Sequence, residues 1–296
     1  MTDLTIPRAH TKLDDLVLLT KIRLNALVVA TTAGGYYMAS ASHAIDPASI
    51  VSTCMGTALV ASGAAALNQA HERDLDRLMN RTKERPVAGG RMGPGEGTAI
   101  ASILSLAGLI ILYVAGSPMA ALVALATLLS YVWIYTPLKR HTSLATVVGA
   151  VPGALPPLIG WVAAGGSLAT AVPWSMFLLM FVWQLPHFLA IAWLYREDYA
   201  RAGLPMLPVV DRNGVLTGRQ AALWAATLLP ISELPFLLGL TSATYGIAAL
   251  VLGMGLLVLA VRFMLDRSTE HARRLFFGSI IYLPLLWILM GVGRRG

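Results

Sequence analysis

The sequence predicts an all-α integral membrane protein with nine transmembrane helices. Two features of the composition support this fold class: 56% of the 296 residues are hydrophobic and 12% are charged, whereas soluble domains carry about 25% charged residues. The mean hydropathy is +0.68, so lipid is the expected solvent for most of the chain. The composition excludes a disordered chain. The single cysteine, Cys54, excludes a disulfide scaffold and a cysteine-based metal site.

Nine apolar stretches define the expected helices, because a helix of about 20 apolar residues crosses the hydrocarbon core of a bilayer. They show no alternation of period two, which excludes barrel strands. In chain order they span residues 24–40, 50–71, 98–116, 118–136, 143–164, 172–195, 220–240, 243–264 and 275–293. Residues 1–23 precede them as a cytoplasmic tail, and residues 1–296 are expected to form one polytopic membrane domain, with 24–296 as its helical part.

The positions of the basic residues predict the orientation, because Lys and Arg gather on the cytoplasmic side of membrane proteins. Of the 22 Lys and Arg residues, all except Arg294 and Arg295 lie in the tail or at the inner ends of the second, fourth, sixth and eighth stretches. We therefore expect the amino terminus inside and the carboxyl terminus outside, in a cell inner membrane. The net charge of +7 follows from this topology. No basic, aromatic-interleaved face of the kind that binds nucleic acid is present.

The second stretch runs into a polar segment, 68–86. Asn68, Glu72 and Asp76 recur at i, i+4 and i+8, which places three oxygen ligands on one helix face. Mg²⁺ prefers such ligands and shares its remaining positions with phosphate oxygens. Cations suited to a diphosphate follow: Arg77, Arg81, Lys83 and Arg85. Salt bridges along a solvated helix end would also explain the charges, and Asp74, on another face, fits that role. They do not explain Asn68 inside an apolar stretch.

The sixth stretch ends in a second polar group, which contains His187 and is followed by Asp198. Polar groups follow both the second and the sixth stretch. This correspondence predicts two halves of four helices each, with a ninth helix appended and a site between the halves. His187 has two interpretations, a hydrogen-bonded structural residue or a haem-iron ligand. Glu233, in the seventh stretch between Pro230 and Pro235, is the other ionisable group within the membrane, and we expect a structural or neutral-acid role for it.

Four segments resemble the UbiA-type membrane prenyltransferases, and among them the protoheme IX farnesyltransferases, or haem O synthases: 68–86, 135–142, 149–161 and 183–208. The resemblance extends over about residues 15–295. The combination of Trp-Gln-Leu-Pro-His-Phe (183–188) with Glu-Asp-Tyr-Ala-Arg-Ala-Gly-Leu-Pro-Met-Leu-Pro (197–208) is typical of this haem branch. Three departures are Ile22 in place of the proline of a Lys-Pro-Arg motif, Ala145 in place of an asparagine, and Ala202 in place of the second aspartate of a D-x3-D motif.

The resemblance implies transfer of farnesyl from farnesyl diphosphate to a vinyl group of haem B, with addition of water, to give haem O and diphosphate for haem-copper terminal oxidases. Mg²⁺ would be bound by Asn68, Glu72 and Asp76, with Asp198 as a further ligand. The diphosphate would be bound by Arg77, Arg81, Lys83, Arg85, Lys139 and Arg140. The haem or prenyl pocket would include His187, Tyr135, Trp183 and Tyr195. Candidate protein partners are a haem A synthase and a terminal oxidase.

Two alternatives remain at this stage. The first is a UbiA-type enzyme that prenylates an aromatic quinone precursor. The second is a transporter or channel, which would need charges along a transmembrane path. Most acids of this chain lie at the predicted inner face instead, which favours the enzyme, with its active site near the cytoplasmic surface.

Overall fold

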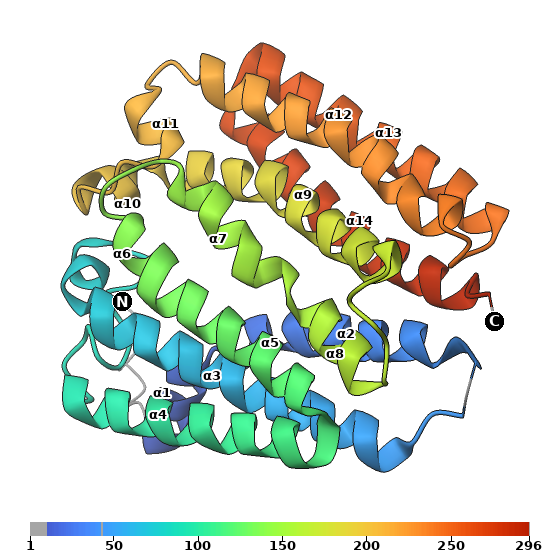
Figure 1. The fold of residues 1–296 in the computed structure, drawn as a ribbon. Helices are drawn as coiled ribbons and strands as arrows, with labels where there is room; N and C mark the ends of the chain where they lie inside the picture. The colour runs from blue at the N-terminus through green and yellow to red at the C-terminus, as the bar shows by residue number, and fades with distance from the viewer. Residues whose placement is uncertain (1–10, 43, 296) are drawn as a thin grey trace, which may run out of the picture.

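In the computed structural model, residues 11–42 and 44–295 are described, and this part of the chain is helical apart from turns and one isolated bridge between Thr241 and Arg294 (Figure 1). The long helices are α2 (Ile22–Ala39), α3 (Pro47–Leu78), α4 (Pro94–Ile111), α5 (Pro118–Leu129), α9 (Ala171–Leu194), α12 (Val215–Leu237), α13 (Ala243–Asp266) and α14 (Thr269–Val292). The prediction of an all-α fold is confirmed. Arg8, which contributed to the expected basic tail, lies outside the described residues.

The shorter helical segments interrupt or connect these helices. They are α1 (Lys12–Thr20), η1 (Ser40–Ser42), η2 (Leu112–Gly116), η3 (Ser130–Tyr135), α6 (Thr136–Leu138), α7 (Ala145–Ala154), α8 (Pro156–Ala163), α10 (Arg196–Arg201) and α11 (Leu207–Val210). η2 and η3 are π-helical continuations of α4 and α5. α1 occupies part of the expected tail, so this tail contains a helix of its own.

Seven helical spans of the described residues are long and apolar enough to cross a membrane, and an eighth results if α1 and α2, which meet at an angle of 44°, form one bent span. These eight correspond to expected stretches. The remaining stretch, 220–240, forms helix α12 but is not among the seven. α12 carries Arg219 near its start and Glu233 near its end, and such residues lower its hydropathy relative to the other helices.

α3 determines where the polar segment 68–86 lies. Asp46 caps its start by accepting a hydrogen bond from the backbone of Ala48, and Pro47 occupies the first turn, where a missing N–H is harmless. At 32 residues the helix is about 48 Å long, which exceeds the roughly 30 Å thickness of a hydrocarbon core. Its last turns therefore extend past the apolar region and carry the acids with them.

The helices pack in two groups with α7 between them. Figure 1 shows α2, α3, α4, α5 and α8 below, and α9, α12, α13 and α14 above. α2 and α8 approach closely because Gly160 lies against the backbone of Thr32, where a Cβ would overlap the carbonyl oxygen. The division into two halves of four helices with an appended ninth remains a prediction.

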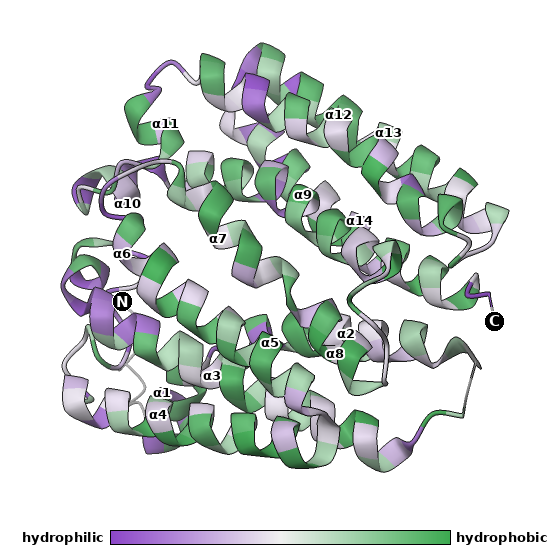
Figure 2. Cartoon of the chain, viewed as in Figure 1, coloured by the Kyte–Doolittle hydropathy of each residue, from purple (hydrophilic) through white to green (hydrophobic). Residues whose placement is uncertain are grey.

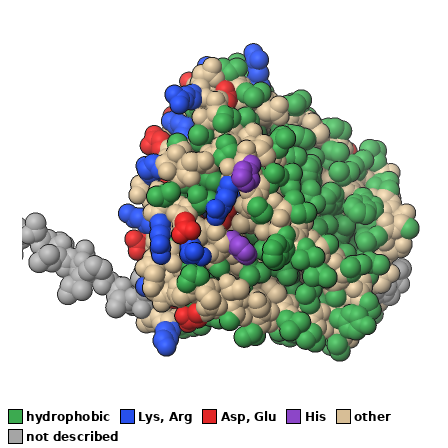
Figure 3. Space-filling model, turned by 60° about the vertical axis from the view of Figure 1, so that its left-hand side comes forward, with side chains coloured by type: hydrophobic (Ala, Val, Ile, Leu, Met, Phe, Trp, Pro, Cys, Tyr) green, Lys and Arg blue, Asp and Glu red, His purple; other side chains and the backbone are tan. Residues whose placement is uncertain are grey.

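Polar residues concentrate at one end of the bundle. Figure 2 shows hydrophilic residues at the end that holds α1, α10 and the α3–α4 connection, whereas the helices are mainly hydrophobic along their lengths. Figure 3 shows acidic and basic side chains on one side of the molecule and a broad apolar surface beside them. The carboxyl terminus lies at the opposite end from this charged region.

Candidate active site

A cavity of about 600 Å³ lies between the two helical groups and is lined by α2, α3, α5, η3, α7, α8 and α9. Its size falls within the range of small-molecule sites, about 300–1,000 Å³. The ionic side chains and the Asn68 amide gather in one part of it: Lys21, Asn68, Glu72, Asp76, Arg81, Arg85 and Lys139. Small and apolar side chains line the remainder, among them Val28, Val60, Ala64, Leu128, Pro152 and Ile159. The cavity can therefore hold a molecule with an anionic head and an apolar body.

Asn68, Glu72 and Asp76 all face this cavity from successive turns of α3. Each side chain is almost fully buried, with exposed fractions of 3%, 2% and 0%. The spacing i, i+4, i+8 correctly predicted a shared face because α3 continues without a break to Leu78.

Each of these three side chains is paired with a different cation. Nζ of Lys21 donates to Oδ1 of Asn68 at 3.3 Å. Arg85 donates from one guanidinium nitrogen to both oxygens of Asp76, at 2.9 and 2.8 Å. Lys139 donates to both oxygens of Glu72, at 3.1 Å each. Charges buried at this depth need such partners. Three cations from three separate segments consequently converge on one side of the cavity.

Lys21 is a residue of this group that sequence reasoning did not assign. Its backbone is left-handed, with φ +49° and ψ +45°, a conformation that costs a non-glycine residue about 1–2 kcal/mol. This turn ends α1, starts α2 and creates the 44° angle between them. The bend directs the Lys21 ammonium toward Asn68. Local sequence gives no clear signal for it, because Lys is an ordinary helix-forming residue.

Of the six predicted diphosphate-binding cations, three line the cavity: Arg81, Arg85 and Lys139. The other three are not among the lining residues. Arg77 follows Asp76 by one position, so it lies about 100° around the helix, and its Nε donates to the carbonyl of Ala88 at 2.8 Å. Arg140 donates to the carbonyl of His71 at 2.9 Å, and Lys83 is exposed.

Asp198 lies on α10 and is also outside the set of cavity-lining residues. It forms an ion pair with Arg201 and accepts a hydrogen bond from the backbone N–H of Arg81 at 3.3 Å. It thereby ties the loop after α3 to the segment after α9. Within the described residues, no three His, Cys, Asp or Glu side chains are grouped closely enough to hold a metal ion, so the structure does not join Asp198 to Glu72 and Asp76.

The predicted aromatic residues divide in the same way. Tyr135 lines the cavity beside Tyr131, with ring centroids 5.4 Å apart. Tyr195 lies at the end of α9, is 40% exposed and has the guanidinium of Arg81 5.1 Å above its ring. Trp183 faces α14, where its Nε1 donates to the carbonyl of Ser279 at 2.9 Å. Neither Tyr195 nor Trp183 lines the cavity.

His187 also faces α14. Its ring stacks between Trp183 and Phe276, at centroid distances of 5.0 and 5.2 Å, and Nδ1 lies 2.7 Å from Oγ of Ser279. The Ser279 hydroxyl also lies 2.7 Å from the carbonyl of Phe276. The ring is therefore held through Nδ1, and no hydrogen bond from the described residues engages Nε2. His187 is thus hydrogen-bonded as a structural residue would be, and one ring nitrogen remains available.

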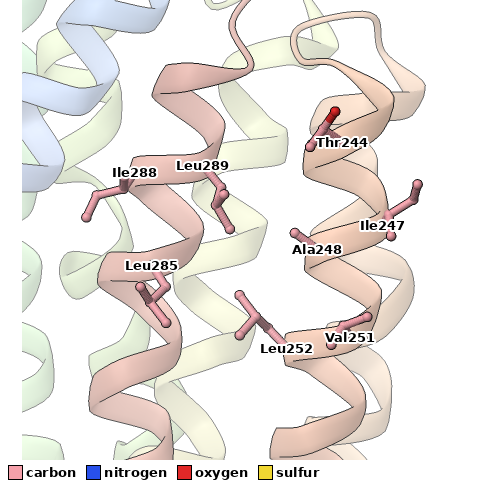
Figure 4. A pocket seen from close by; sticks show the side chains of 8 residues that line it. All are labelled: Thr244, Ile247, Ala248, Val251, Leu252, Leu285, Ile288 and Leu289. Atoms are coloured by element: carbon pink, nitrogen blue, oxygen red, sulfur yellow. The ribbon is translucent and has the colours of Figure 1, made fainter.

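Two further features lie away from the cavity. Glu233 has a buried Oε1 without a hydrogen-bond partner among the described residues, and its expected structural or neutral-acid role remains a prediction. A second hollow of about 490 Å³ runs between α13 and α14. Figure 4 shows that its lining is apolar except for Thr244, so it offers no ionisable groups for chemistry.

Comparison with known proteins agrees with this geometry. The model of the UbiA prenyltransferase family matches residues 27–282. The chain belongs to the UbiA prenyltransferase family. The UbiA resemblance inferred from the four sequence segments is thereby confirmed.

Relatives within the UbiA family match nearly the whole length of the chain. The protoheme IX farnesyltransferase of Solibacter usitatus (strain Ellin6076) is 43% identical over 290 residues, covering 95% of this chain and 99% of that protein. The protoheme IX farnesyltransferase of Aquifex aeolicus (strain VF5) is 41% identical, covering 92% of each. The identification of this chain with the haem branch of the family is confirmed by this similarity.

Solved structures show that the fold is that of UbiA proteins. A structure of digeranylgeranylglyceryl phosphate synthase has a TM-score of 0.78 at 17% identity and covers 95% of this chain and 98% of that one. A UbiA homologue from Archaeoglobus fulgidus, bound to GPP and Mg²⁺, has a TM-score of 0.63 at 14% identity, covering 93% and 99%.

Proposed function

We propose that this UbiA-family chain transfers a farnesyl group from farnesyl diphosphate to a vinyl group of haem B and adds water, producing haem O and diphosphate. The observation that carries the proposal is the cavity, in which cations and buried oxygen ligands adjoin an apolar space. A prenyl diphosphate has the same two parts. Full-length relatives of about 40% identity that are named protoheme IX farnesyltransferase support haem as the acceptor.

The diphosphate would bind where the cations converge. Arg81, Arg85, Lys139 and Lys21 face the cavity from three segments of the chain. Their positive charge would stabilise the negative charge that develops on the diphosphate as the bond to farnesyl breaks, and such preorganised electrostatics dominate many catalysed reactions. In the absence of substrate Lys21, Arg85 and Lys139 are satisfied by Asn68, Asp76 and Glu72 respectively, so the site need not leave these buried charges unpaired.

The residues on α3 fit Mg²⁺. An amide oxygen and two carboxylates, from Asn68, Glu72 and Asp76, face one cavity from successive turns, and such hard oxygen donors are those that Mg²⁺ prefers. The ion would supply further positive charge to the diphosphate. Asp198 would contribute indirectly, by holding the backbone of Arg81. Mg²⁺ bound with GPP in the Archaeoglobus fulgidus homologue supports this assignment.

The apolar part of the cavity would hold the farnesyl chain and protect the reacting carbon. Breaking the bond between farnesyl C1 and the diphosphate oxygen leaves an allylic cation, which premature contact with water would destroy. The rings of Tyr131 and Tyr135 lie beside the ion pairs and can stabilise a cation through their faces. The vinyl β-carbon of haem B would then attack C1.

Haem would approach along α9. Phe188 faces the cavity from this helix, and the next residue back, His187, lies on the neighbouring face with its Nε2 available. An imidazole nitrogen with a free lone pair is a common axial ligand of haem iron. His187 could therefore position a porphyrin beside the cavity, while Trp183 and Phe276 fix the orientation of its ring.

We further propose nine membrane spans, including α12, with the amino terminus inside and the carboxyl terminus outside a cell inner membrane. Clustering of the acidic and basic side chains at one end of the bundle supports this orientation. The active site would then open near the cytoplasmic face. A membrane-bound haem A synthase or terminal oxidase would be the receiver of the product.

The deciding experiment incubates the purified protein in nanodiscs with haem B and farnesyl diphosphate, with Mg²⁺ or with EDTA, and separates the haems by chromatography and mass. A farnesylated and hydrated haem that forms with Mg²⁺ and not with EDTA is expected. Failure of folded protein to modify haem, together with prenylation of an aromatic acid, would show that a quinone precursor is the acceptor. Modification that persists in EDTA would remove the metal from the proposal.

A further inference from the structure

Gln184 is a buried amide in the wall of the cavity that the steps above do not use. It lies in the middle of α9 and is 4% exposed. Its Nε2 donates to the carbonyls of Ala150, at 3.3 Å, and Met180, at 3.0 Å. Both amide protons are therefore occupied. Its Oε1 accepts no hydrogen bond from the described residues, so an acceptor oxygen is presented with its orientation fixed.

A glycine makes room for this oxygen. Gly153 also lines the cavity, and a Cβ added to it would overlap Oε1 of Gln184. Pro152 directly precedes it, Pro156 follows three residues later, and both line the cavity as well. The amide thus lies against the glycine in the wall of the cavity, and neither proline can donate a hydrogen bond to it, because proline has no N–H.

The contacts of α7 show how far Oε1 of Gln184 lies from the ion pairs along the cavity. Gly149 of α7 contacts the ring of Tyr135, and Gly153, four residues further along α7, contacts the Gln184 amide. Four residues correspond to about 6 Å along a helix. The oxygen therefore lies roughly one helical turn beyond Tyr135, on the side away from the pair of Lys139 and Glu72. That is the border between the charged and the apolar parts of the cavity.

The proposed reaction includes a step in which a hydrogen-bond acceptor near the diphosphate would orient a water molecule. After the vinyl β-carbon of haem bonds to farnesyl C1, the positive charge lies on the vinyl α-carbon, a few ångströms from the diphosphate. Addition of water there forms the carbon–oxygen bond of the hydroxyl group, and the water's second proton leaves to the released diphosphate. Without a positioned water, loss of a proton from the adjacent carbon gives an alkene instead.

We propose that Oε1 of Gln184 accepts a hydrogen bond from the water molecule that is added, and so directs the reaction to the hydrated product. This inference rests on the proposed function. An amide is suited to the role because it orients water without competing as a base for the proton that would produce the alkene. The fixed Nε2 contacts prevent the amide from rotating and offering a donor instead.

The ratio of hydrated to dehydrated farnesyl haem tests the inference, since it does not depend on how much active protein is present. Gln184→Met keeps the length of the side chain and removes the oxygen. Gly153→Ala leaves Gln184 intact and displaces its oxygen. Both should raise the share of alkene by about five-fold, the effect of losing about one hydrogen bond. Gly255→Ala, on α13 with open space around it, should keep the wild-type ratio.

A wild-type ratio in both Gln184→Met and Gly153→Ala would overturn the role of Gln184 while the farnesyl transfer itself stands. Loss of both products from folded Gln184→Met would also overturn it, because Gln184 would then act before the carbon–carbon bond forms. If Gln184→Met does not fold, Gly153→Ala and Gln184→Asn decide by the same ratio. Absence of farnesylated haem from the wild-type protein would instead refute the proposed function.

Discussion

Lys139 donates two hydrogen bonds of 3.1 Å to the two carboxylate oxygens of Glu72, although 67 residues separate them. The side chains are 12% and 2% exposed, so neither charge is well solvated. The pair joins the segment after α6, which holds Lys139, to the polar face of α3, which holds Glu72. A buried pair of this kind contributes little net stability, but loss of one partner leaves an unpaired buried charge.

Lys139→Met should therefore destabilise the protein by about 3–5 kcal/mol, since Glu72 would lose its cation. The double variant Lys139→Met/Glu72→Gln removes both charges and should recover most of that loss. Thermal unfolding of the purified proteins in one detergent measures both. A double variant no more stable than Lys139→Met would show that the unpaired charge of Glu72 is not the cause of the instability. Neither variant should farnesylate haem, because both lack groups assigned to the diphosphate site.

Asp76→Asn should reduce the rate of haem farnesylation about 100-fold, the scale of removing one electrostatic group from a reacting centre. Asp76 is fully buried and accepts both hydrogen bonds from Arg85, and the variant preserves its shape but not its charge. Asp74→Asn is the matched control. Asp74 is 66% exposed and pairs with Arg73 at 3.6 Å, as the sequence predicted, so its rate should stay at the wild-type level. Equal rates for both variants would contradict the metal and diphosphate roles of Asp76.

His187→Ala should weaken haem binding, followed by the shift of the haem absorption band during titration, while leaving the binding of farnesyl diphosphate unchanged. The reason is that His187 is the residue proposed to bind the haem iron through Nε2, whereas the cations proposed to bind the diphosphate lie around α3. Ser279→Ala removes the hydroxyl that orients the ring and should have the same effect in weaker form. Equal losses of haem and farnesyl diphosphate binding in His187→Ala would show a purely structural role.

The sequence was sufficient to predict the residues that share a helix face, and insufficient where the chain leaves a helix. Asn68, Glu72 and Asp76 face one cavity because α3 is continuous over all three. After Met79 the chain forms turns, so spacing no longer fixes direction. Arg85 folds back onto Asp76, but Lys83 remains in solvent.

Contacts between distant segments were also beyond sequence reasoning. The approach of Lys21 to Asn68 depends on a left-handed turn at a residue type that seldom adopts one. Trp183 and His187 are spaced i, i+4 and share a face, but that face meets α14 and not the cavity in which both were expected. Periodicity identifies a face, whereas the neighbour it meets depends on how the helices pack.

The orientation of the chain can be tested by the accessibility of single cysteines. In a Cys54→Ser background, Ala169→Cys places a thiol in the exposed α8–α9 connection, and Asn80→Cys places one in the exposed segment after α3. The ion-rich end that holds Asn80 is assigned to the cytoplasm because cytoplasmic loops are basic. Ala169→Cys should therefore react with a membrane-impermeant thiol reagent in intact cells, and Asn80→Cys should react only after permeabilisation. The reverse pattern would show that the topology is inverted. Labelling of both thiols in intact cells would place both connections outside, and would contradict the odd number of crossings expected between them.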